Sequence, residues 1–167
     1  MGVKEHRKQG ARSVVTAIMT VSDTRNRRTD ETGRVLREGL EKAGHKVIRQ
    51  GIVKDERKEI HSWLREALQD DRIHVIITNG GTGVAGRDVT IETVRPLLDK
   101  ELPGFGELFR MLSHKEIGSA AMMSRTLAGV AGRKVVISLP GSPDAARIAL
   151  RELIVPEIGH LVWEATR

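Results

Sequence analysis

A glycine-rich segment and two acidic residues are the parts of this chain best suited to chemistry. Asn79 to Gly83 follows a short apolar run, and Gly86-Arg87-Asp88 comes shortly after it. Four glycines in seven positions leave backbone N–H groups uncovered by side chains. Such a segment between a strand and a helix can cradle a phosphate. Asp88 lies within it and Asp55 precedes another predicted helix, and two carboxylates near bound phosphates can hold Mg²⁺.

The same polar residues also suit structural roles. Asp55, Asp88 and Thr90 each lie where a helix is predicted to begin, and a short polar side chain there can cap free N–H groups. Ser142 is expected to be the N-cap of the last helix, with Pro143 at its first position. Helix N-termini also bind anions, so a capping role does not exclude ligand contact.

Two phosphate-binding motifs resemble the glycine segment. Gly81 to Gly86 matches the dinucleotide fingerprint G-x-G-x-x-G, which leaves a nicotinamide-dependent oxidoreductase as an alternative. That fingerprint usually follows the first strand of its unit, whereas this segment follows the third predicted strand. Gly81 and Gly86 also have the spacing of a P-loop. The P-loop continues with Lys and then Ser or Thr, and this chain has Arg87-Asp88, so the match fails.

Strand and helix patterns alternate along the chain, which predicts a three-layer α/β/α domain with a mostly parallel sheet. Leu102–Gly106 is expected to be a turn, followed by a short helix around Glu107–Leu112, and 113–133 gives no clear pattern. In such a sheet, ligands bind beyond the carboxyl ends of the strands. The loops predicted to meet there are 22–28, 79–88 and 140–142. The predicted strands are Val14–Val21, His45–Val53, Ile73–Thr78 and Lys134–Leu139, and the predicted helices are Glu31–Ala43 and those that follow Asp55, Asp88 and Ser142.

Composition narrows the class of protein. The 167 residues suit a flexible basic tail over 1–11 and a single domain over 12–167. A net charge of +6 favours anionic ligands, but aromatic residues make up 2% and tyrosine is absent, so no base-stacking surface for nucleic acid is expected. With no cysteine, thiolate sites are excluded. No apolar run approaches the roughly 18 residues of a membrane span and no signal peptide is recognisable, so a cytoplasmic protein is expected.

Four motifs occur together in this chain: Thr78 to Gly83, Arg87 to Thr90, Leu102 to Glu107 and Leu139 to Pro143. Their order and spacing resemble the molybdopterin-binding domain of the MogA/MoaB family, which also occurs as the G domain of gephyrin and its plant counterpart. Ser22-Asp23-Thr24-Arg25 after the first strand fits the same pattern, and the resemblance extends from about Ser13 onward. Segments 109–113, 116–118 and 124–125 resemble the MoaB branch in particular.

The resemblance implies a role in molybdenum cofactor biosynthesis. The implied reaction is Mg²⁺- and ATP-dependent adenylylation of molybdopterin, which gives adenylyl-molybdopterin and pyrophosphate before molybdate or tungstate is inserted. Asp55 and Asp88 align with the two essential family aspartates, as catalytic residues and Mg²⁺ ligands, although Lys54 stands where the family usually has proline. The residues expected to bind substrate are Ser22, Asp23, Asn79, Gly80, Gly81, Thr82, Gly83, Thr90, Ser113, Arg125, Pro140, Gly141 and Ser142.

The resemblance also implies partners. It predicts a homotrimer, or a homohexamer as in the MoaB branch, and a metal-insertion protein as a further partner. Because a trimer should bury an apolar surface, we expect residues 102–131 to form part of the interface. The alternative within the same pathway is a non-catalytic molybdopterin-binding or scaffold protein.

Overall fold

Six strands form one mixed sheet in the computed structural model, which describes residues 13–167. The expected basic tail, 1–11, lies outside the described residues. The strand order is β2-β1-β3-β6-β5-β4; β1, β2, β3 and β6 run parallel, while β5 is antiparallel to both β6 and β4. The strands are β1 (Val15–Val21), β2 (Lys46–Val53), β3 (Val75–Asn79), β4 (Lys100–Glu101), β5 (Leu127–Ala131) and β6 (Lys134–Leu139).

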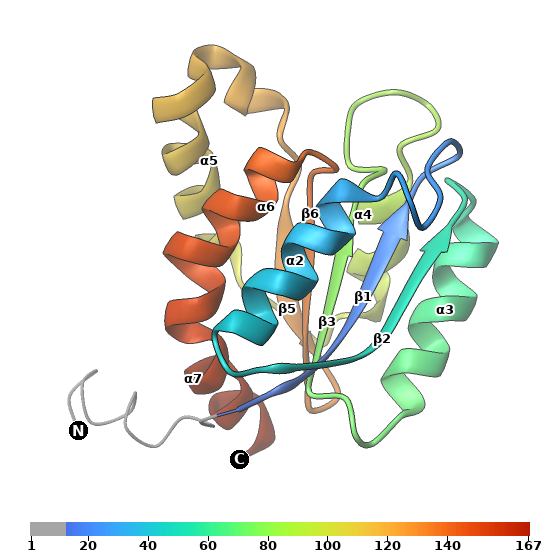
Figure 1. Ribbon diagram of the computed structural model, residues 1–167, viewed down its shortest axis with the longest axis vertical. Helices are drawn as coiled ribbons and strands as arrows, with labels where there is room; N and C mark the ends of the chain where they lie inside the picture. Colours follow the sequence, from blue (N-terminus) through green and yellow to red (C-terminus); the bar gives the residue numbers. More distant parts are fainter. Residues whose placement is uncertain (1–12) are drawn as a thin grey trace.

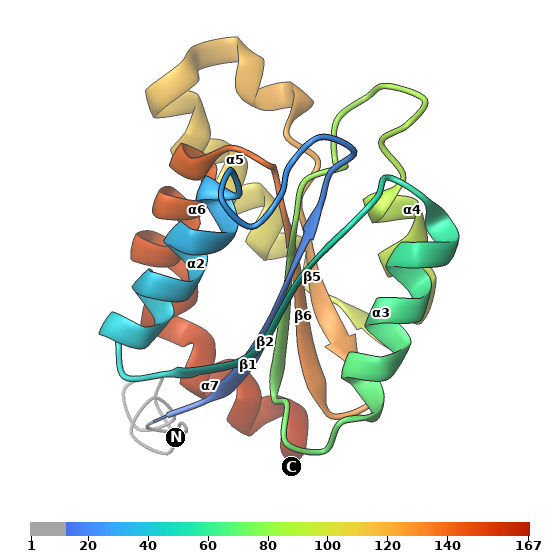
Figure 2. The same cartoon turned by 45° about the vertical axis from the view of Figure 1, so that its right-hand side comes forward.

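Helices cover both faces of the sheet, which confirms the predicted three-layer α/β/α architecture (Figure 1). Figure 2 shows α2, α5, α6 and α7 on one side of the sheet and α3 and α4 on the other. Each side has its own buried apolar cluster, with Ile18, Ile77 and Ile137 on the first and Met19, Ile76 and Val136 on the second. The helices are α2 (Glu31–Lys42), α3 (Arg57–Gln69), α4 (Thr90–Val94), α5 (Pro103–Ile117), α6 (Pro143–Ala149) and α7 (Val155–Thr166).

Short helical segments complete the chain. The 3₁₀ helix η1 (Arg95–Leu97) continues α4 at Pro96, and η2 (Gly118–Met123) follows α5. A π-helical turn, η3 (Leu150–Ile154), joins α6 to α7. Within residues 13–167, none of the helices has the length and apolar character that crossing a membrane requires.

The predicted strands and most of the helices are confirmed, with boundaries that differ by a few residues. α2 begins at the expected place because Asp30 caps it, accepting the Gly33 N–H at 2.9 Å. It ends at Lys42, and Gly44, just after the C-cap Ala43, has a φ of 88° that suits a left-handed helix terminus. Ser142 caps α6 as predicted, accepting the Ala145 N–H at 3.2 Å.

The region after β4 differs from the prediction. The expected turn at 102–106 is the start of α5, a helix of 15 residues that begins at Pro103. Proline is tolerated there because the first N–H of a helix has no intrahelical partner. Gly106 lies in this first part of the helix and is buried, so its role is close packing rather than a turn. Residues that gave no pattern form the end of α5, η2 and the edge-side strand β5.

Candidate active site

Four strands end at one edge of the sheet and bring the predicted loops together. The ends of β1, β3 and β6 are level, because Thr20 pairs with Asn79 and Asn79 with Leu139. The Ser22 N–H donates to the Val53 carbonyl at 2.8 Å, which joins the ends of β1 and β2. The chain moves from β1 to β2 on one side and to β3 on the other, so a crevice for a ligand is expected at this edge.

The glycine loop, residues 80–89, lies tightly against the end of β1. Gly80 and Gly81 have φ of 89° and 63°, a conformation that favours glycine. A Cβ on Gly80 would lie 2.2 Å from the Val21 carbonyl oxygen. A Cβ on Gly81 would lie 2.4 Å from Oγ1 of Thr90 and 2.7 Å from Oδ1 of Asp55. The two glycines therefore allow an approach to β1 and Asp55 that no other residue type could make.

Thr90 holds the first part of this loop. Its N–H donates to the Gly81 carbonyl and its hydroxyl to the Gly80 carbonyl, both at 2.9 Å, and the side chain is buried. The capping role considered for Thr90 is wrong, because Val89 is the N-cap of α4 and Thr90 is its first residue. The prediction that Thr90 binds substrate stays open, and its visible contribution is to fix two loop carbonyls.

Arg125 binds the remaining part of the glycine loop, residues 82–88, through its backbone carbonyls. Its Nε donates to the carbonyls of Thr82 and Gly83 at 3.0 and 2.9 Å, and Nη2 donates to the Asp88 carbonyl at 3.2 Å. The guanidinium also forms an ion pair with Glu92 on α4, and hydrogen bonding to Arg125 lowers the pKa of that carboxyl. Arg125 thus positions the loop, and its guanidinium has little donor capacity left for a ligand.

Thr90 and Arg125 bind carbonyl groups of the glycine loop and leave N–H groups of the same loop available. Within residues 13–167, the N–H groups of Gly81, Thr82 and Gly83 donate to no protein acceptor. Successive free amides in a glycine turn form a concave site for an anion. The geometry therefore supports the phosphate cradle inferred from the sequence.

The carboxylates of Asp23, Asp55 and Asp88 lie near one another beside the phosphate cradle. Asp55 lies between β2 and α3, and its carboxylate is next to Gly81. Burial raises the pKa of Asp55, and the negative charges of Asp23 and Asp88 raise it further. The suggested cap role of Asp55 is wrong, since Glu56 occupies the N-cap position of α3 and makes no side-chain cap. A raised pKa at a cleft carboxyl is characteristic of functional sites.

The carboxylate of Asp88 contacts residues 83–85 of its own loop. Its Oδ2 accepts the Ala85 N–H at 2.9 Å and would lie 2.7 Å from a Cβ on Gly83. The residue considered as a cap of α4 therefore organises the glycine loop instead. Asp55 and Asp88 lie close enough for one charge to affect the other, as the sequence hypothesis requires.

The carboxylates fit Mg²⁺ held jointly with substrate. Within residues 13–167 no three acidic or histidine side chains are arranged to hold a metal by themselves. Mg²⁺ commonly takes one or two carboxylates, with phosphates and water as its other ligands. Asp55 and Asp88 supply two hard oxygen donors beside the cradle, and this donor set suits that arrangement.

Arg87 is the functional candidate that sequence reasoning missed. Its guanidinium reaches from the glycine loop to Asp23, with Nη2 2.7 Å from Oδ2, and to Glu56, with Nη1 3.0 Å from Oε1. Hydrogen bonding to Arg87 lowers the pKa of Asp23. The signal in the sequence was an arginine directly before Asp88, but its partners lie 64 and 31 residues away along the chain.

Other predicted site residues shape the edge of the sheet. Asn79 is fully buried, and its amide donates to Oγ1 of Thr20 at 2.9 Å, which ties β3 to β1. The Ser22 hydroxyl accepts the N–H groups of Thr24 and Arg25 at 3.2 and 3.1 Å. These contacts are structural, and binding of substrate by Asn79 and Ser22 stays a prediction.

The last predicted loop is held to the first. The Gly141 carbonyl accepts from Arg25 at 2.8 Å and from Thr32 at 2.7 Å. A Cβ on Gly141 would lie 3.2 Å from the Gly80 Cα, so the loop at 140–142 also touches the glycine loop. Ser113 is different: it is buried in the last turn of α5 and, within residues 13–167, hydrogen-bonds to none of these loops.

Comparison with known proteins shows the family to which the sequence is similar. A family model described as a probable molybdopterin binding domain matches residues 17–160. The molybdenum cofactor biosynthesis protein B of Bacillus cereus is 51% identical over 168 residues, which cover 100% of this chain and 99% of that protein.

Solved structures show the same fold. The chain resembles the crystal structure of a molybdenum cofactor biosynthesis protein B with a TM-score of 0.89 and 51% identity, covering 92% of this chain and 96% of the other. It also resembles the tungsten cofactor synthesizing protein MoaB from Pyrococcus furiosus, with a TM-score of 0.85 and 36% identity, covering 94% and 99% of the two chains.

Proposed function

Because the chain belongs to the molybdopterin-binding domain family of molybdenum cofactor biosynthesis, we propose that it transfers an adenylyl group from ATP to molybdopterin. The observation that carries the proposal is the free N–H groups of Gly81, Thr82 and Gly83 beside Asp55 and Asp88. A phosphate cradle next to two carboxylates suits phosphoryl-group chemistry that depends on positioning and charge neutralisation.

In this reaction an oxygen of the molybdopterin phosphate attacks the α-phosphorus of ATP. A new P–O bond forms, the bond from the α-phosphorus to the β-bridging oxygen breaks, and pyrophosphate leaves with that oxygen. The attacking group is already an anion, so no side chain has to become a nucleophile. What the protein must supply is alignment of two phosphorylated molecules and balance of their negative charge.

The site residues divide these tasks. The loop amides would hold phosphate oxygens, and Thr90 and Arg125 keep those amides in place by binding the loop carbonyls. Asp55 and Asp88 would hold Mg²⁺. When bound, Mg²⁺ would neutralise phosphate charge and favour departure of pyrophosphate. Arg87 would supply a cation at the same edge and keep the Asp23 carboxylate neutralised.

Self-association as a trimer or hexamer is part of the proposal. Apolar side chains on α5 and η2 are unusually exposed: Met111 by 52%, Ile117 by 55%, Met122 by 81% and Met123 by 54%. Exposed apolar groups gathered in one region mark interaction sites. They lie within 102–131, the segment expected at an interface. Light scattering on the purified protein tests this, and a monomer at all concentrations would contradict it. A metal-insertion protein remains a proposed further partner.

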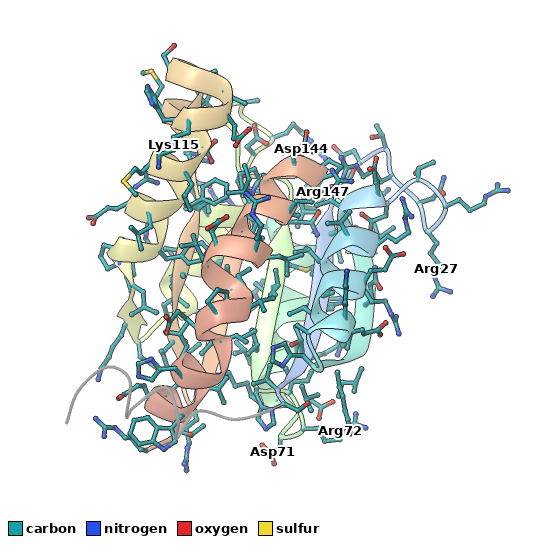
Figure 3. All side chains as sticks on the ribbon, turned by 60° about the vertical axis from the view of Figure 1, so that its left-hand side comes forward. Arg27, Asp71, Arg72, Lys115, Asp144 and Arg147 are labelled. Carbon is teal, nitrogen blue, oxygen red and sulfur yellow. The ribbon has the colours of Figure 1, made fainter. Side chains whose placement is uncertain are left out.

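The proposed function is tested by measuring pyrophosphate release from Mg-ATP under anaerobic conditions, with and without molybdopterin. Release should require molybdopterin and should fall at least about 100-fold in Asp88→Asn and Asp55→Asn. Asp71→Asn is the matched control, because Asp71 lies at the end of the molecule away from Asp144 and the site edge (Figure 3). Tight molybdopterin binding without pyrophosphate release would instead establish the scaffold alternative. A rise in the unfolding temperature with NAD but not with Mg-ATP would favour a nicotinamide-dependent oxidoreductase.

A further inference from the structure

A pocket distinct from the candidate active site is lined in part by Arg125, the residue that holds the glycine loop, and the proposed reaction does not use it. It is a groove of about 340 Å³ between α4, α5, η2 and β5. We name it the Arg110 groove. The residues that matter to its chemistry are Arg95, Glu101, Gly106, Arg110, Arg125 and Thr126. Its volume is within the range of small-molecule pockets and too small for a folded protein segment.

The cations of the groove differ in how they are paired. Arg95 forms an ion pair with Glu101 at 2.8 Å, and Arg125 is engaged by Glu92 and the loop carbonyls. Arg110 is half-buried, yet within residues 13–167 its guanidinium has no hydrogen-bond acceptor or ion-pair partner. Glu107 also lines the groove but is exposed and makes no ion pair with Arg110 in this part of the chain. Among the described residues, the groove therefore contains one guanidinium without a direct partner, and the Glu107 carboxylate at its exposed side is the other unpaired charge.

Thr126 contributes a second donor without a partner. The residue is 8% exposed, and its hydroxyl is enclosed with no hydrogen bond among the described residues. Buried hydroxyls without partners are uncommon because leaving one unpaired is costly. Such a group is a candidate for contact with a molecule absent from the protein.

Gly106 brings these donors together. A Cβ at this position would lie 3.1 and 3.2 Å from Nη1 and Nη2 of Arg110 and 3.2 Å from Oγ1 of Thr126. The three donor atoms therefore converge around the space that a larger residue would fill. The side chain of Arg110 points back along α5, as long helical side chains do, toward Gly106 in the first part of the helix.

We propose that the Arg110 groove binds an oxyanion, the phosphate or carboxylate group of a small molecule. Arg110 supplies the charge and a forked pair of donors, which match oxyanion geometry. The enclosed Thr126 hydroxyl adds a hydrogen bond when the flexible Arg110 side chain shifts toward the ligand. The oxyanion is either a free ion or a group on a larger substrate, and these two sources can be separated by competition.

The test is calorimetric titration of the full chain with inorganic phosphate in the presence of saturating Mg-ATP, which by the proposed function occupies the glycine loop. A phosphate site that depends on Arg110 should remain, separate from any position that the molybdopterin phosphate would use. Its affinity should fall at least about tenfold in Arg110→Gln, because a charged hydrogen-bond pair is lost. Gly106→Ala should have a similar effect while keeping every charge, since the added methyl group crowds both donors. Arg72→Gln removes a charge at the far end of the molecule (Figure 3) and should leave phosphate affinity unchanged.

Thr126→Val gives a readout that a purely structural threonine would not. Replacing an unpaired hydroxyl by a methyl group should keep or raise the unfolding temperature of the free protein, while phosphate affinity falls about threefold. If molybdopterin competes with phosphate for the groove, the oxyanion is a group on the substrate. If molybdopterin does not compete, the oxyanion is a free ion.

Other results would overturn the proposal. These are the absence of any phosphate site once Mg-ATP is bound, or equal affinities in wild type, Gly106→Ala and Thr126→Val. A change of oligomeric state in Arg110→Gln without any phosphate binding would show that a carboxylate of a second copy occupies the groove. Pyrophosphate release is measured separately, so failure here leaves the adenylyl-transfer proposal standing.

Discussion

Arg87 and Asp23 join two loops that are 64 residues apart in sequence, with Nη2 of the arginine 2.7 and 2.9 Å from the two carboxylate oxygens. The pair crosses the crevice beside Asp55, whose backbone N–H donates to the same Asp23 carboxylate at 3.2 Å. Arg87 is thus a cation that balances this group of carboxylates. Its positive charge and a Mg²⁺ ion would oppose each other at the same edge.

Arg87→Gln should therefore bind Mg²⁺ more tightly than wild type when no nucleotide is present, by roughly threefold to tenfold for an exposed charge. Binding of Mg-ATP should weaken, because a cation at the edge where the phosphates are proposed to bind is lost. Isothermal titration with Mg²⁺ alone and with Mg-ATP measures both. Arg72→Gln is the matched control, since Arg72 also pairs with a loop acid, Asp70, but at the opposite end of the molecule (Figure 3). Weaker Mg²⁺ binding in Arg87→Gln would show that the pair only supports the loops.

Gly81→Ala should unfold more readily and lose phosphate binding. Its φ of 63° and the 2.4 Å approach to Thr90 leave no room for a methyl group. The free energy of unfolding should fall by about 2 kcal/mol or more. Gly86→Ala, in the same loop, meets no atom within 4 Å and has no positive φ, so its effect should stay within about 0.5 kcal/mol. Equal stabilities in urea unfolding would mean that the loop is not held as described.

Arg125→Lys should loosen the glycine loop without unfolding the domain. Lysine keeps the charge but lacks the planar fork of donors that reaches the carbonyls of Thr82, Gly83 and Asp88 from separate nitrogen atoms. Hydrogen exchange should become faster over 82–88, and the KM for ATP should rise more than kcat falls. Arg95→Lys, which affects an exposed ion pair on η1, should change neither. Unchanged exchange in Arg125→Lys would remove this residue from loop positioning.

His45 should make stability depend on pH near neutrality. Burial lowers the pKa of His45 from its ordinary value of 6.5, and Nδ1 accepts the Val14 N–H at 3.3 Å, which requires a neutral ring. The unfolded chain therefore binds the proton more readily. This contribution is fully present above about pH 6.5 and is lost as pH falls toward the lowered pKa. Unfolding of wild type and His45→Gln should diverge between pH 7 and 5, whereas the exposed His61→Gln should follow wild type.

Periodicity predicted the sheet and its helices because alternating apolar strands and amphipathic stripes dominate the chain. The prediction failed at α5, where Pro103, Gly104 and Gly106 indicate a turn when they are considered locally. Only tertiary packing explains Gly106, since it faces Arg110 and Thr126, groups from another turn of the helix and from the segment before β5. β5 was missed because its small residues, with a glycine at 129, carry a weak strand signal.

The order of strands and loops in the sequence predicts which loops form the site but not the contacts between their side chains. A parallel sheet places the loops after β1, β2, β3 and β6 at one edge, so the sequence could bring Asp55 and Asp88 together. It could not show that Arg87 reaches Asp23, or that Arg125 binds loop carbonyls from 42 and 43 residues away. Such pairs depend on three-dimensional contacts that have no local pattern.

The most direct test follows the α-phosphate itself. ATP labelled at the α-position is mixed with excess protein, Mg²⁺ and molybdopterin, and a single turnover is quenched and separated. The account predicts that the label appears in adenylyl-molybdopterin, with the transfer slowed at least about 100-fold in Asp88→Asn although molybdopterin still binds. Bound molybdopterin that never acquires label, in a folded wild-type protein, would contradict adenylyl transfer and leave a binding protein on the same fold.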